Sequence, residues 1–174
     1  ATAKLAIEKG AAVFLVSRDR DAMGGLVAEF EAQGGRAGFA VADVGVDAEI
    51  RDAAQAAISQ FGHFDTWINN AGTAVYSNLT DLPLDEHRQI FETNYWGTVH
   101  GSLAAVEHFR NRDGGGTLIN VGSVNGDVPI PYLSAYSASK HAVKGFTDAL
   151  RMELLHDRAP VQVTLIKPSG IATP

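Results

Sequence analysis

Short apolar runs alternate with longer stretches of helical pattern along almost the whole chain. The short runs are nearly continuous in Val, Ile, Leu, Phe and Ala, which suits strands buried on both faces. This pattern predicts strands over residues 11–16, 36–42, 64–70, 117–123 and 161–167. It predicts helices over residues 1–9, 21–33, 47–61, 85–110 and 134–156, with a break near Asn94.

Strands separated by helices of ten or more residues predict βαβ units, and therefore a parallel sheet covered on both faces. We expect an α/β fold built on a Rossmann-like, doubly wound parallel sheet. No internal repeat, low-complexity segment or linker stands out, and the glycine run 114–116 indicates a loop. Residues 1–174 are therefore expected to form a single domain.

The two ends of the sequence are unusual. The chain starts at Ala1 inside a predicted helix, with no Met and no strand before it, and it stops at Pro174 shortly after a strand. We interpret it as an interior piece of a longer protein, so the lack of a targeting peptide carries no information.

Composition excludes several classes of protein. The 174 residues suffice for one core, and 45% hydrophobic with 20% charged residues is ordinary for a globular protein. The net charge of −6 and the lack of a basic run argue against nucleic acid or a membrane surface as partner. No apolar run approaches the roughly 20 residues that span a bilayer. With no cysteine, disulfides and thiolate metal sites are excluded, and a cytoplasmic location is expected.

Ligands of doubly wound sheets bind beyond the carboxyl ends of the strands, so candidate chemistry is expected there. Ser17 and Arg18 follow the first predicted strand. No acidic residue stands there to bond a ribose 2′-hydroxyl, whereas Ser17 and the forked cation of Arg18 suit a 2′-phosphate. The pair therefore favours NADP(H), with NAD(H) as the alternative. An ordinary exposed arginine is the other interpretation, because Asp19 or Asp21 could pair with it.

Two further strand ends carry polar residues. Asp43 and Val44 follow the second predicted strand, where a carboxylate could accept from an adenine amino group or cap the next helix. The sequence NNAG, Asn69–Gly72, ends the third predicted strand. Its Gly lets the backbone approach a ligand closely, and its Asn side chains can fasten neighbouring loops. Away from a strand end, the same tetrapeptide would indicate only a turn.

The last two strand ends complete the set. Ser123 lies at the tip of the strand 117–123, where its hydroxyl could donate to a substrate carbonyl oxygen or serve only as a turn residue. The segment KPSGIAT, residues 167–173, is broken by Pro168 and Gly170. Its backbone and Thr173 could contact a ring amide, or it could be an ordinary exit from the strand.

Tyr136 and Lys140 lie four residues apart in YSASK and share one face of the predicted helix. A phenol with a pKa of about 10 barely ionises at neutral pH, but a nearby cation favours the phenolate. The pair could be a tuned proton donor, and an isolated pair of this kind could equally be a surface contact.

Together these residues resemble the short-chain dehydrogenase/reductases, over nearly the whole sequence. The family pattern is Asn-Asn-Ala-Gly, an Asn in the long helix, a Ser at the next strand end, Tyr-x-x-x-Lys, and a Pro-Gly segment with Thr. In this chain Ser123 precedes Tyr136 by 13 residues, a spacing typical of the family. Two features depart from the pattern: the glycine-rich turn after the family's first strand is absent, and Ser169 replaces the Gly after Pro168.

The resemblance implies an NAD(P)-dependent enzyme that transfers a hydride to or from a carbonyl or secondary alcohol, such as a carbonyl reductase. Tyr136 would be the general acid and base, Lys140 would bond the ribose and lower the Tyr136 pKa, and Ser123 would hold the substrate oxygen. Asn94 would disturb its helix and hold a water that relays protons to Lys140. The cofactor-binding residues would be Ser17, Arg18, Asp43, Val44, Asn70, Ala71, Gly72, Tyr136, Lys140, Pro168, Gly170 and Thr173.

The resemblance also implies a dinucleotide-binding domain that lacks the family's first strand and C-terminal part. Because that strand is central, its loss would leave two apolar edges, and the chain alone is expected to fold poorly. A homotetramer or homodimer is implied through the helices 85–110 and 134–156. The apolar segment 126–133 would admit a hydrophobic substrate, with Tyr132 as a residue of that pocket.

Three other interpretations compete with this one. A cofactor-binding sensor or scaffold without turnover would be expected to lose the Tyr or Lys, which this chain keeps. Ser137 to Lys140 also fits S-x-x-K of acyl-transfer enzymes, but the companion motifs S-D-N and K-T-G are missing. The six histidines show no H-x-x-x-H pair, so no metal site is expected.

Overall fold

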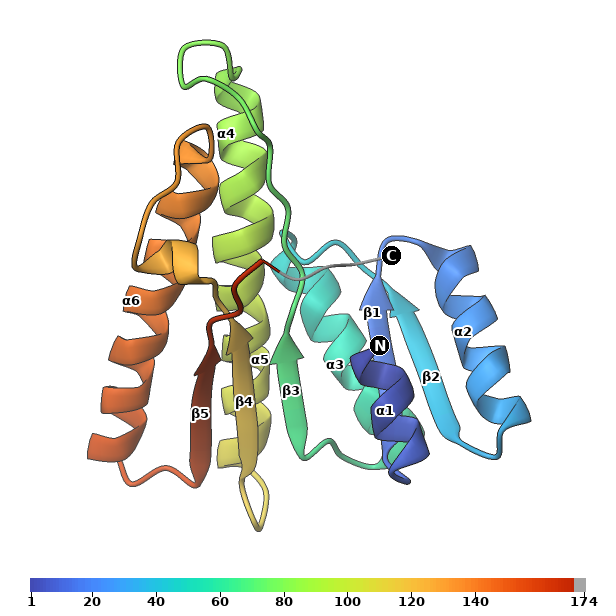
Figure 1. The fold of residues 1–174 in the computed structure, drawn as a ribbon. Helices are drawn as coiled ribbons and strands as arrows, with labels where there is room; N and C mark the ends of the chain where they lie inside the picture. The colour runs from blue at the N-terminus through green and yellow to red at the C-terminus, as the bar shows by residue number, and fades with distance from the viewer. Residues whose placement is uncertain (171–174) are drawn as a thin grey trace. The chain divides into compact units, whose positions relative to one another are not determined.

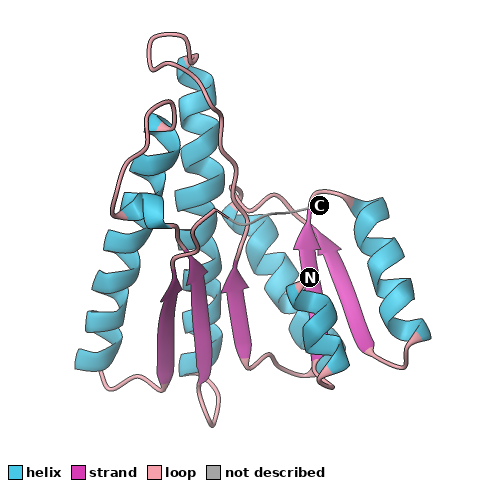
Figure 2. Ribbon diagram, in the orientation of Figure 1, coloured by secondary structure: helices cyan, strands magenta, loops and turns pink. Residues whose placement is uncertain are grey.

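The structure is a computed structural model that describes residues 1–170 (Figure 1). It consists of two compact units, with the boundary between Phe64 and Asp65. In each unit helices connect parallel strands (Figure 2). The expected α/β class with parallel strands is therefore confirmed, while the prediction of a single domain stays a prediction.

The first unit holds two parallel strands and the helices that connect them. Its elements in chain order are α1 (Thr2–Glu8), β1 (Ala12–Ser17), α2 (Arg20–Ala32), β2 (Arg36–Val41) and α3 (Asp47–Phe61). Ile7, Phe30 and Ala37 form its buried apolar cluster. The strands pair in register from Ala12 opposite Arg36 to Ser17 opposite Val41. The loops that follow β1 and β2 therefore leave the sheet at the same edge.

The second unit holds a parallel sheet in the order β3-β4-β5. Its strands and α-helices are β3 (Thr66–Asn69), α4 (Leu84–Phe91), α5 (Gly97–Arg110), β4 (Gly116–Val121), α6 (Ser134–His156) and β5 (Val161–Ile166). Asn69 pairs with Asn120, and Val121 pairs with Ile166. Because the strands run in one direction, their carboxyl ends form one edge, where the NNAG, Ser123 and Pro168 segments begin.

Two short elements interrupt this regular alternation. A π-helix, η1 (Glu92–Trp96), joins α4 to α5, and Asn94 at its centre is fully buried. The predicted break near Asn94 is thus present as one wide turn, a feature that occurs frequently at functional sites. A 3₁₀ turn, η2 (Val124–Gly126), follows β4 and was not predicted.

A buried network of side-chain amides and hydroxyls ties this sheet to its helices. The Asn69 Nδ2 donates 2.8 Å to Asn120 Oδ1 and 3.1 Å to Ser102 Oγ on α5. The Asn120 Nδ2 donates 2.9 Å to Thr147 Oγ1 on α6. A Cβ at position 101 would clash with Asn69 Oδ1, so Gly101 lets α5 lie close enough for these bonds. The network fixes the carboxyl end of β3 beside that of β4.

The observed elements confirm the predicted strands and helices, with ends that shift by at most a few residues. Among the described residues, β1 has β2 as its only strand neighbour and β3 has β4. The expectation that the chain alone folds poorly stays a prediction. No helix in residues 1–170 combines the length and the apolar character needed to cross a membrane.

Candidate active site

The second unit contains a cavity of about 350 Å³ at the carboxyl ends of its strands. Residues from four separate segments line it. They are Asn70, Gly72, Thr73 and Ala74 after β3, Val121, Gly122 and Ser123 at the end of β4, Tyr136 and Lys140 on α6, and Pro168 and Ser169 after β5. The structure thus brings together the Ser, Tyr and Lys that the sequence analysis selected.

Lys140 is a buried cation among the residues that line this cavity. Only 4% of the residue is exposed, and its Nζ donates 2.9 Å to the backbone carbonyl of Val121. Among the described residues no carboxylate contacts it, and burial lowers the pKa of Lys140 to about 8. Its Nζ lies 5.8 Å from the centre of the half-buried Tyr136 ring. The one-turn spacing therefore places cation and phenol side by side, as predicted.

Ser123 lies just beyond β4 and is buried, with 8% exposed. Its Oγ accepts a 3.1 Å hydrogen bond from the backbone N–H of Asn125 and so caps η2. A hydroxyl that accepts one bond keeps its own proton to donate. The turn therefore holds the oxygen in place and leaves the proton for a ligand in the cavity.

Asn94 connects the NNAG segment to α6. Its Oδ1 accepts from Thr73 N at 2.8 Å, and its Nδ2 donates to Thr73 O and to Ser139 Oγ, each at 2.9 Å. Ser139 Oγ in turn donates 2.7 Å to the carbonyl of Tyr136. A Cβ built at Gly72 would lie 3.5 Å from both Asn94 Oδ1 and Lys140 Nζ. Asn94 therefore positions the loop that faces Lys140, and the water relay expected of it stays a prediction.

The predicted cofactor residues of this unit divide into three groups. Asn70, Gly72 and Pro168 line the cavity, together with Tyr136 and Lys140, whereas Ala71 and Gly170 are not among its lining residues. Thr173 lies outside the described residues. The sequence analysis missed Thr73, Ala74, Val121 and Gly122, which lie next to selected motifs and carry no chemical signal of their own.

The other predicted cofactor residues lie together in the first unit, at the carboxyl ends of β1 and β2. Arg18 pairs with Asp43 over 3.4 Å, while 73% of the Arg18 side chain remains exposed. Asp19 instead caps α2 by accepting from Ala22 N at 3.0 Å, and Ser17 Oγ accepts from Asp19 N. The ion-pair partner of Arg18 is therefore Asp43, and the alternative that Asp19 or Asp21 pairs with it is wrong.

The proposed helix-capping role of Asp43 is also wrong. The residue that caps α3 is Val46, which has no side-chain acceptor. The Asp43 Oδ1 instead accepts from Gly45 N at 2.9 Å, and its own N–H donates 2.7 Å to Glu49 Oε2. These bonds close a tight turn beside the half-buried Val44 and aim the carboxylate at Arg18.

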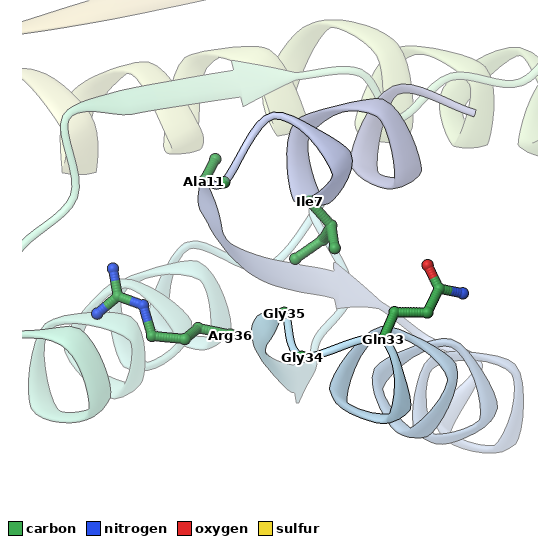
Figure 3. Close-up of a pocket in the computed structure, with 7 residues that line it drawn as sticks. Ile7, Ala11, Gln33, Gly34, Gly35 and Arg36 are labelled. Carbon is green, nitrogen blue, oxygen red and sulfur yellow. The ribbon is translucent and has the colours of Figure 1, made fainter.

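A second cavity, of about 260 Å³, lies at the opposite edge of the first unit's strands (Figure 3). Its lining residues are Ile7, Gly10, Ala11, Gln33, Gly34, Gly35 and Arg36. The backbone N–H groups of its three glycines already donate to helix carbonyls. Figure 3 shows the Gln33 and Arg36 side chains pointing away from each other. The side chains of Gln33 and Arg36 therefore do not converge on a ligand position in this cavity.

Residues 1–170 hold no group of three or more His, Asp or Glu side chains arranged to bind a metal ion. The side chains that line the first cavity include the hydroxyl of Ser123, the phenol of Tyr136 and the ammonium of Lys140. These are groups that donate and accept protons beside a ligand oxygen.

Comparisons with known proteins agree on one family. The family model described as short chain dehydrogenase matches residues 1–174. The "Uncharacterized oxidoreductase YxnA" of Bacillus subtilis is 43% identical over 173 residues, covering 99% of this chain and 49% of that protein. The "Dehydrogenase/reductase SDR family member 7B" of Mus musculus is 38% identical over 135 residues, covering 78% of this chain and 40% of that protein. The chain thus spans about half the length of these curated relatives.

Solved structures show the same fold. A short chain dehydrogenase/reductase from Burkholderia phymatum, in complex with NAD, is 26% identical with a TM-score of 0.94, covering 97% of this chain and 60% of that chain. A short-chain dehydrogenase from Streptomyces avermitilis is 27% identical with a TM-score of 0.88, covering 98% of this chain and 61% of that chain. These likenesses confirm the Rossmann-like α/β fold.

Proposed function

Because the chain belongs to the short-chain dehydrogenase/reductase family, we propose that it interconverts a carbonyl compound and a secondary alcohol, using NADP(H) in preference to NAD(H). The observation that carries the proposal is the meeting of Ser123, Tyr136 and the buried Lys140 in one cavity. A scaffold that binds no cofactor would have no need of a cation that burial makes costly to keep charged.

The lining of the cavity suits a nicotinamide cofactor, which supplies or accepts the hydride when bound. An ammonium has three N–H groups, and Lys140 uses one of them on Val121, so two remain for ribose hydroxyls. The backbone at Gly72 and Gly122 allows a flat ring to approach closely, and Pro168 forms part of the wall. Ser169 fills the place of the family's usual Gly in that wall without closing the cavity.

The proton steps fall to this chain's own side chains. The Tyr136 hydroxyl gives its proton to the substrate oxygen during reduction and takes one back during oxidation. The ammonium of Lys140 stabilises the negative charge that this transfer leaves on the phenol oxygen. Ser123 donates its free proton to the substrate oxygen and holds it beside Tyr136. Asn94 is proposed to hold the water that returns a proton to Lys140.

The cofactor preference rests on Ser17 and Arg18. The guanidinium of Arg18 is mostly exposed, and its single long contact with Asp43 leaves donors for a 2′-phosphate. Asp43 and Val44 are proposed to contact the adenine. NAD(H) is the alternative, since the similar Burkholderia phymatum protein was solved in complex with NAD.

The substrate is proposed to be hydrophobic. The segment after η2 exposes Val128, Ile130 and Tyr132. The carbonyl of Tyr132 accepts a 3.0 Å bond from Ser77 N, which joins this segment to the loop after the NNAG segment. The segment after η2 and the loop after the NNAG segment both continue from residues that line the cavity. An apolar group on the substrate's carbonyl carbon would therefore contact these two segments. Tyr132 is proposed as a contact of that group.

We also propose a homodimer or homotetramer formed through the long helices. Trp96 and Leu103 on the η1–α5 segment, and Met152 and Leu155 on α6, expose large apolar side chains. Burial of such side chains against a second copy would stabilise an assembly. Light scattering at two protein concentrations tests this, and a monomer at both would contradict it.

The experiment for the reaction follows loss of nicotinamide absorbance in the full-length protein, with NADPH and with NADH. The substrates are a panel of hydrophobic ketones, diketones and aldehydes. Turnover that favours NADPH supports both parts of the proposal, and turnover that favours NADH overturns the cofactor preference alone. Cofactor binding without turnover on any member of the panel would favour the sensor.

A further inference from the structure

One carboxylate outside the cavity is held by two lysines from different elements. The Asp127 Oδ1 lies 2.8 Å from Lys144 Nζ, and its Oδ2 lies 2.7 Å from Lys167 Nζ. Asp127 directly follows η2, Lys144 lies on α6, and Lys167 directly follows β5. We call these residues the Asp127 clasp. Each of its members comes from a different one of the segments that build the cavity.

Every member of the clasp lies close in sequence to a lining residue. Asp127 comes four residues after Ser123, Lys144 one helical turn after Lys140, and Lys167 immediately before Pro168. None of the three lines the cavity. The clasp can therefore act on the cavity only through the backbone that it holds.

The backbone between Ser123 and Asp127 is confined from two sides. On the β5 side, Gly122 N donates 2.8 Å to Ile166 O, and Val124 N donates 3.1 Å to Pro168 O. On the α6 side, a Cβ at Gly126 would lie only 2.8 Å from Lys140 O. The turn that carries Ser123 thus has little room to move unless α6 or the exit from β5 moves away.

The single negative charge of Asp127 balances the positive charges of both Lys144 and Lys167. Hydrogen bonds from Lys144 and Lys167 lower the pKa of Asp127 to about 2, so the carboxylate is charged throughout the neutral range. Without it, two ammonium groups would face each other and repel. The three side chains are 34–40% exposed, so their contribution to global stability is small. The consequence of losing Asp127 is therefore local.

We propose that Asp127 is a positioning residue, which holds the Ser123 turn against α6 and the exit from β5 through Lys144 and Lys167. It touches neither substrate nor cofactor. The expected effect of Asp127 on the reaction rate rests on the proposed function. Its effect on the position of the Ser123 turn does not depend on that function. Since a displacement of about 1 Å can cost up to 10²-fold in rate, Asp127→Asn is expected to lower kcat/KM about 10- to 100-fold.

Hydrogen exchange tests the proposal without any reaction. In Asp127→Asn of the full-length protein, the amides of Gly122 and Val124 should exchange at least ten-fold faster, while those of β4 keep their rates. The matched control is Asp157→Asn, which removes a 2.7 Å ion pair of similar exposure with Arg110. Unchanged exchange at Gly122 and Val124 in Asp127→Asn overturns the proposal, and so does uniform acceleration across β4.

Three further pairs of variants test the lysine arms and the packing of the turn. Lys144→Met and Lys167→Met each remove one arm and should give part of the loss, whereas Lys144→Arg and Lys167→Arg should restore most of it. Gly126→Ala leaves the clasp intact but should push the turn away from α6. It should therefore give the same fast exchange of the Gly122 and Val124 amides as Asp127→Asn. Gly145→Ala, on α6 with open space around it, is its control. Arginine variants that behave like the methionine variants would overturn the clasp.

The outcomes for the clasp and for the reaction are distinguishable. If the wild type turns over and Asp127→Asn keeps its kcat/KM, the positioning role is wrong and the proposed function stands. If the wild type lacks turnover but Asp127→Asn shows the localised fast exchange, the clasp stands and the proposed function fails.

Discussion

The ammonium of Lys140 lies 5.8 Å from the centre of the Tyr136 ring, and no carboxylate contacts it among the described residues. Most lysines at protein surfaces have water or an acidic partner to balance their charge. Here the balance is one backbone carbonyl, so the remaining field acts on the cavity that holds the phenol. This arrangement leads to the first two predictions.

Replacement of Tyr136 by Phe should lower kcat by at least 10²-fold, because the proton donor is lost while the ring that packs beside Lys140 remains. Cofactor affinity should stay within about two-fold of the wild type, since the hydroxyl is one contact among many. Steady-state kinetics and fluorescence titration with NADPH measure the two effects. Tyr95→Phe is the control, because that phenol lies on η1 and is not among the residues that line the cavity. Near-normal turnover in Tyr136→Phe would reject the assignment.

Lys140 should make the free energy of unfolding depend on pH. Its pKa is about 8 in the folded protein, below the ordinary lysine value of 10.5, so between these values the unfolded chain binds more protons. Stability should therefore rise as the pH increases from 8 to 10, by up to about 1.4 kcal/mol per pH unit relative to Lys140→Met. Below pH 8 both states carry the proton, and the difference should become constant.

Urea unfolding of wild type and Lys140→Met at several pH values measures this difference. Lys144→Met is the control of opposite sign, because the hydrogen bond with Asp127 raises the pKa of Lys144. The stabilisation by the Lys144 charge is fully present below the ordinary lysine pKa of 10.5 and is lost only at higher pH. The difference between wild type and Lys144→Met should therefore stay constant between pH 8 and 10. If the difference in free energy of unfolding between wild type and Lys140→Met is constant from pH 8 to 10, Lys140 is less desolvated than its burial indicates.

Arg18→Ala should weaken NADPH binding at least ten-fold and leave NADH binding nearly unchanged, because only NADPH carries the 2′-phosphate. Its contact with Asp43 is long and exposed, so its loss should cost little stability. Calorimetric titration with each cofactor measures the two affinities. Arg20→Ala, in the first turn of α2, controls for the loss of a nearby positive charge. Equal losses for both cofactors would remove the 2′-phosphate role from Arg18.

The sequence was sufficient to predict the fold and to predict that Ser123, Tyr136 and Lys140 lie together. Periodicity determines which element a residue belongs to, and parallel strands bring their carboxyl ends to one edge. Ser123, Tyr136 and Lys140 could therefore be placed together from spacing and family pattern. The wide turn at Asn94 was predicted as a break, although its π-helical form was not.

The contacts that were missed depend on groups that periodicity cannot distinguish. The acceptor for Lys140 is the carbonyl of Val121, and every residue has a carbonyl. Arg18 pairs with Asp43, 25 residues away, although Asp19 and Asp21 are much nearer in sequence. That choice follows from the register of β1 and β2 and from the turn at Gly45. The Asp127 clasp, whose partners are 17 and 40 residues away, could not be predicted for the same reason.

The last prediction concerns the buried amide network. Asn120→Leu keeps the number of side-chain heavy atoms but removes the donor to Thr147 Oγ1 and the nearest acceptor of Asn69 Nδ2. Two buried hydrogen bonds are lost, and each contributes about 0.5–1.5 kcal/mol, so the free energy of unfolding should fall by about 1–3 kcal/mol. Urea unfolding measures it. Asn111→Leu, at the exposed end of α5, should change it by no more than about 0.5 kcal/mol. Equal values for the two variants would mean that the network does not hold β3 to β4, α5 and α6.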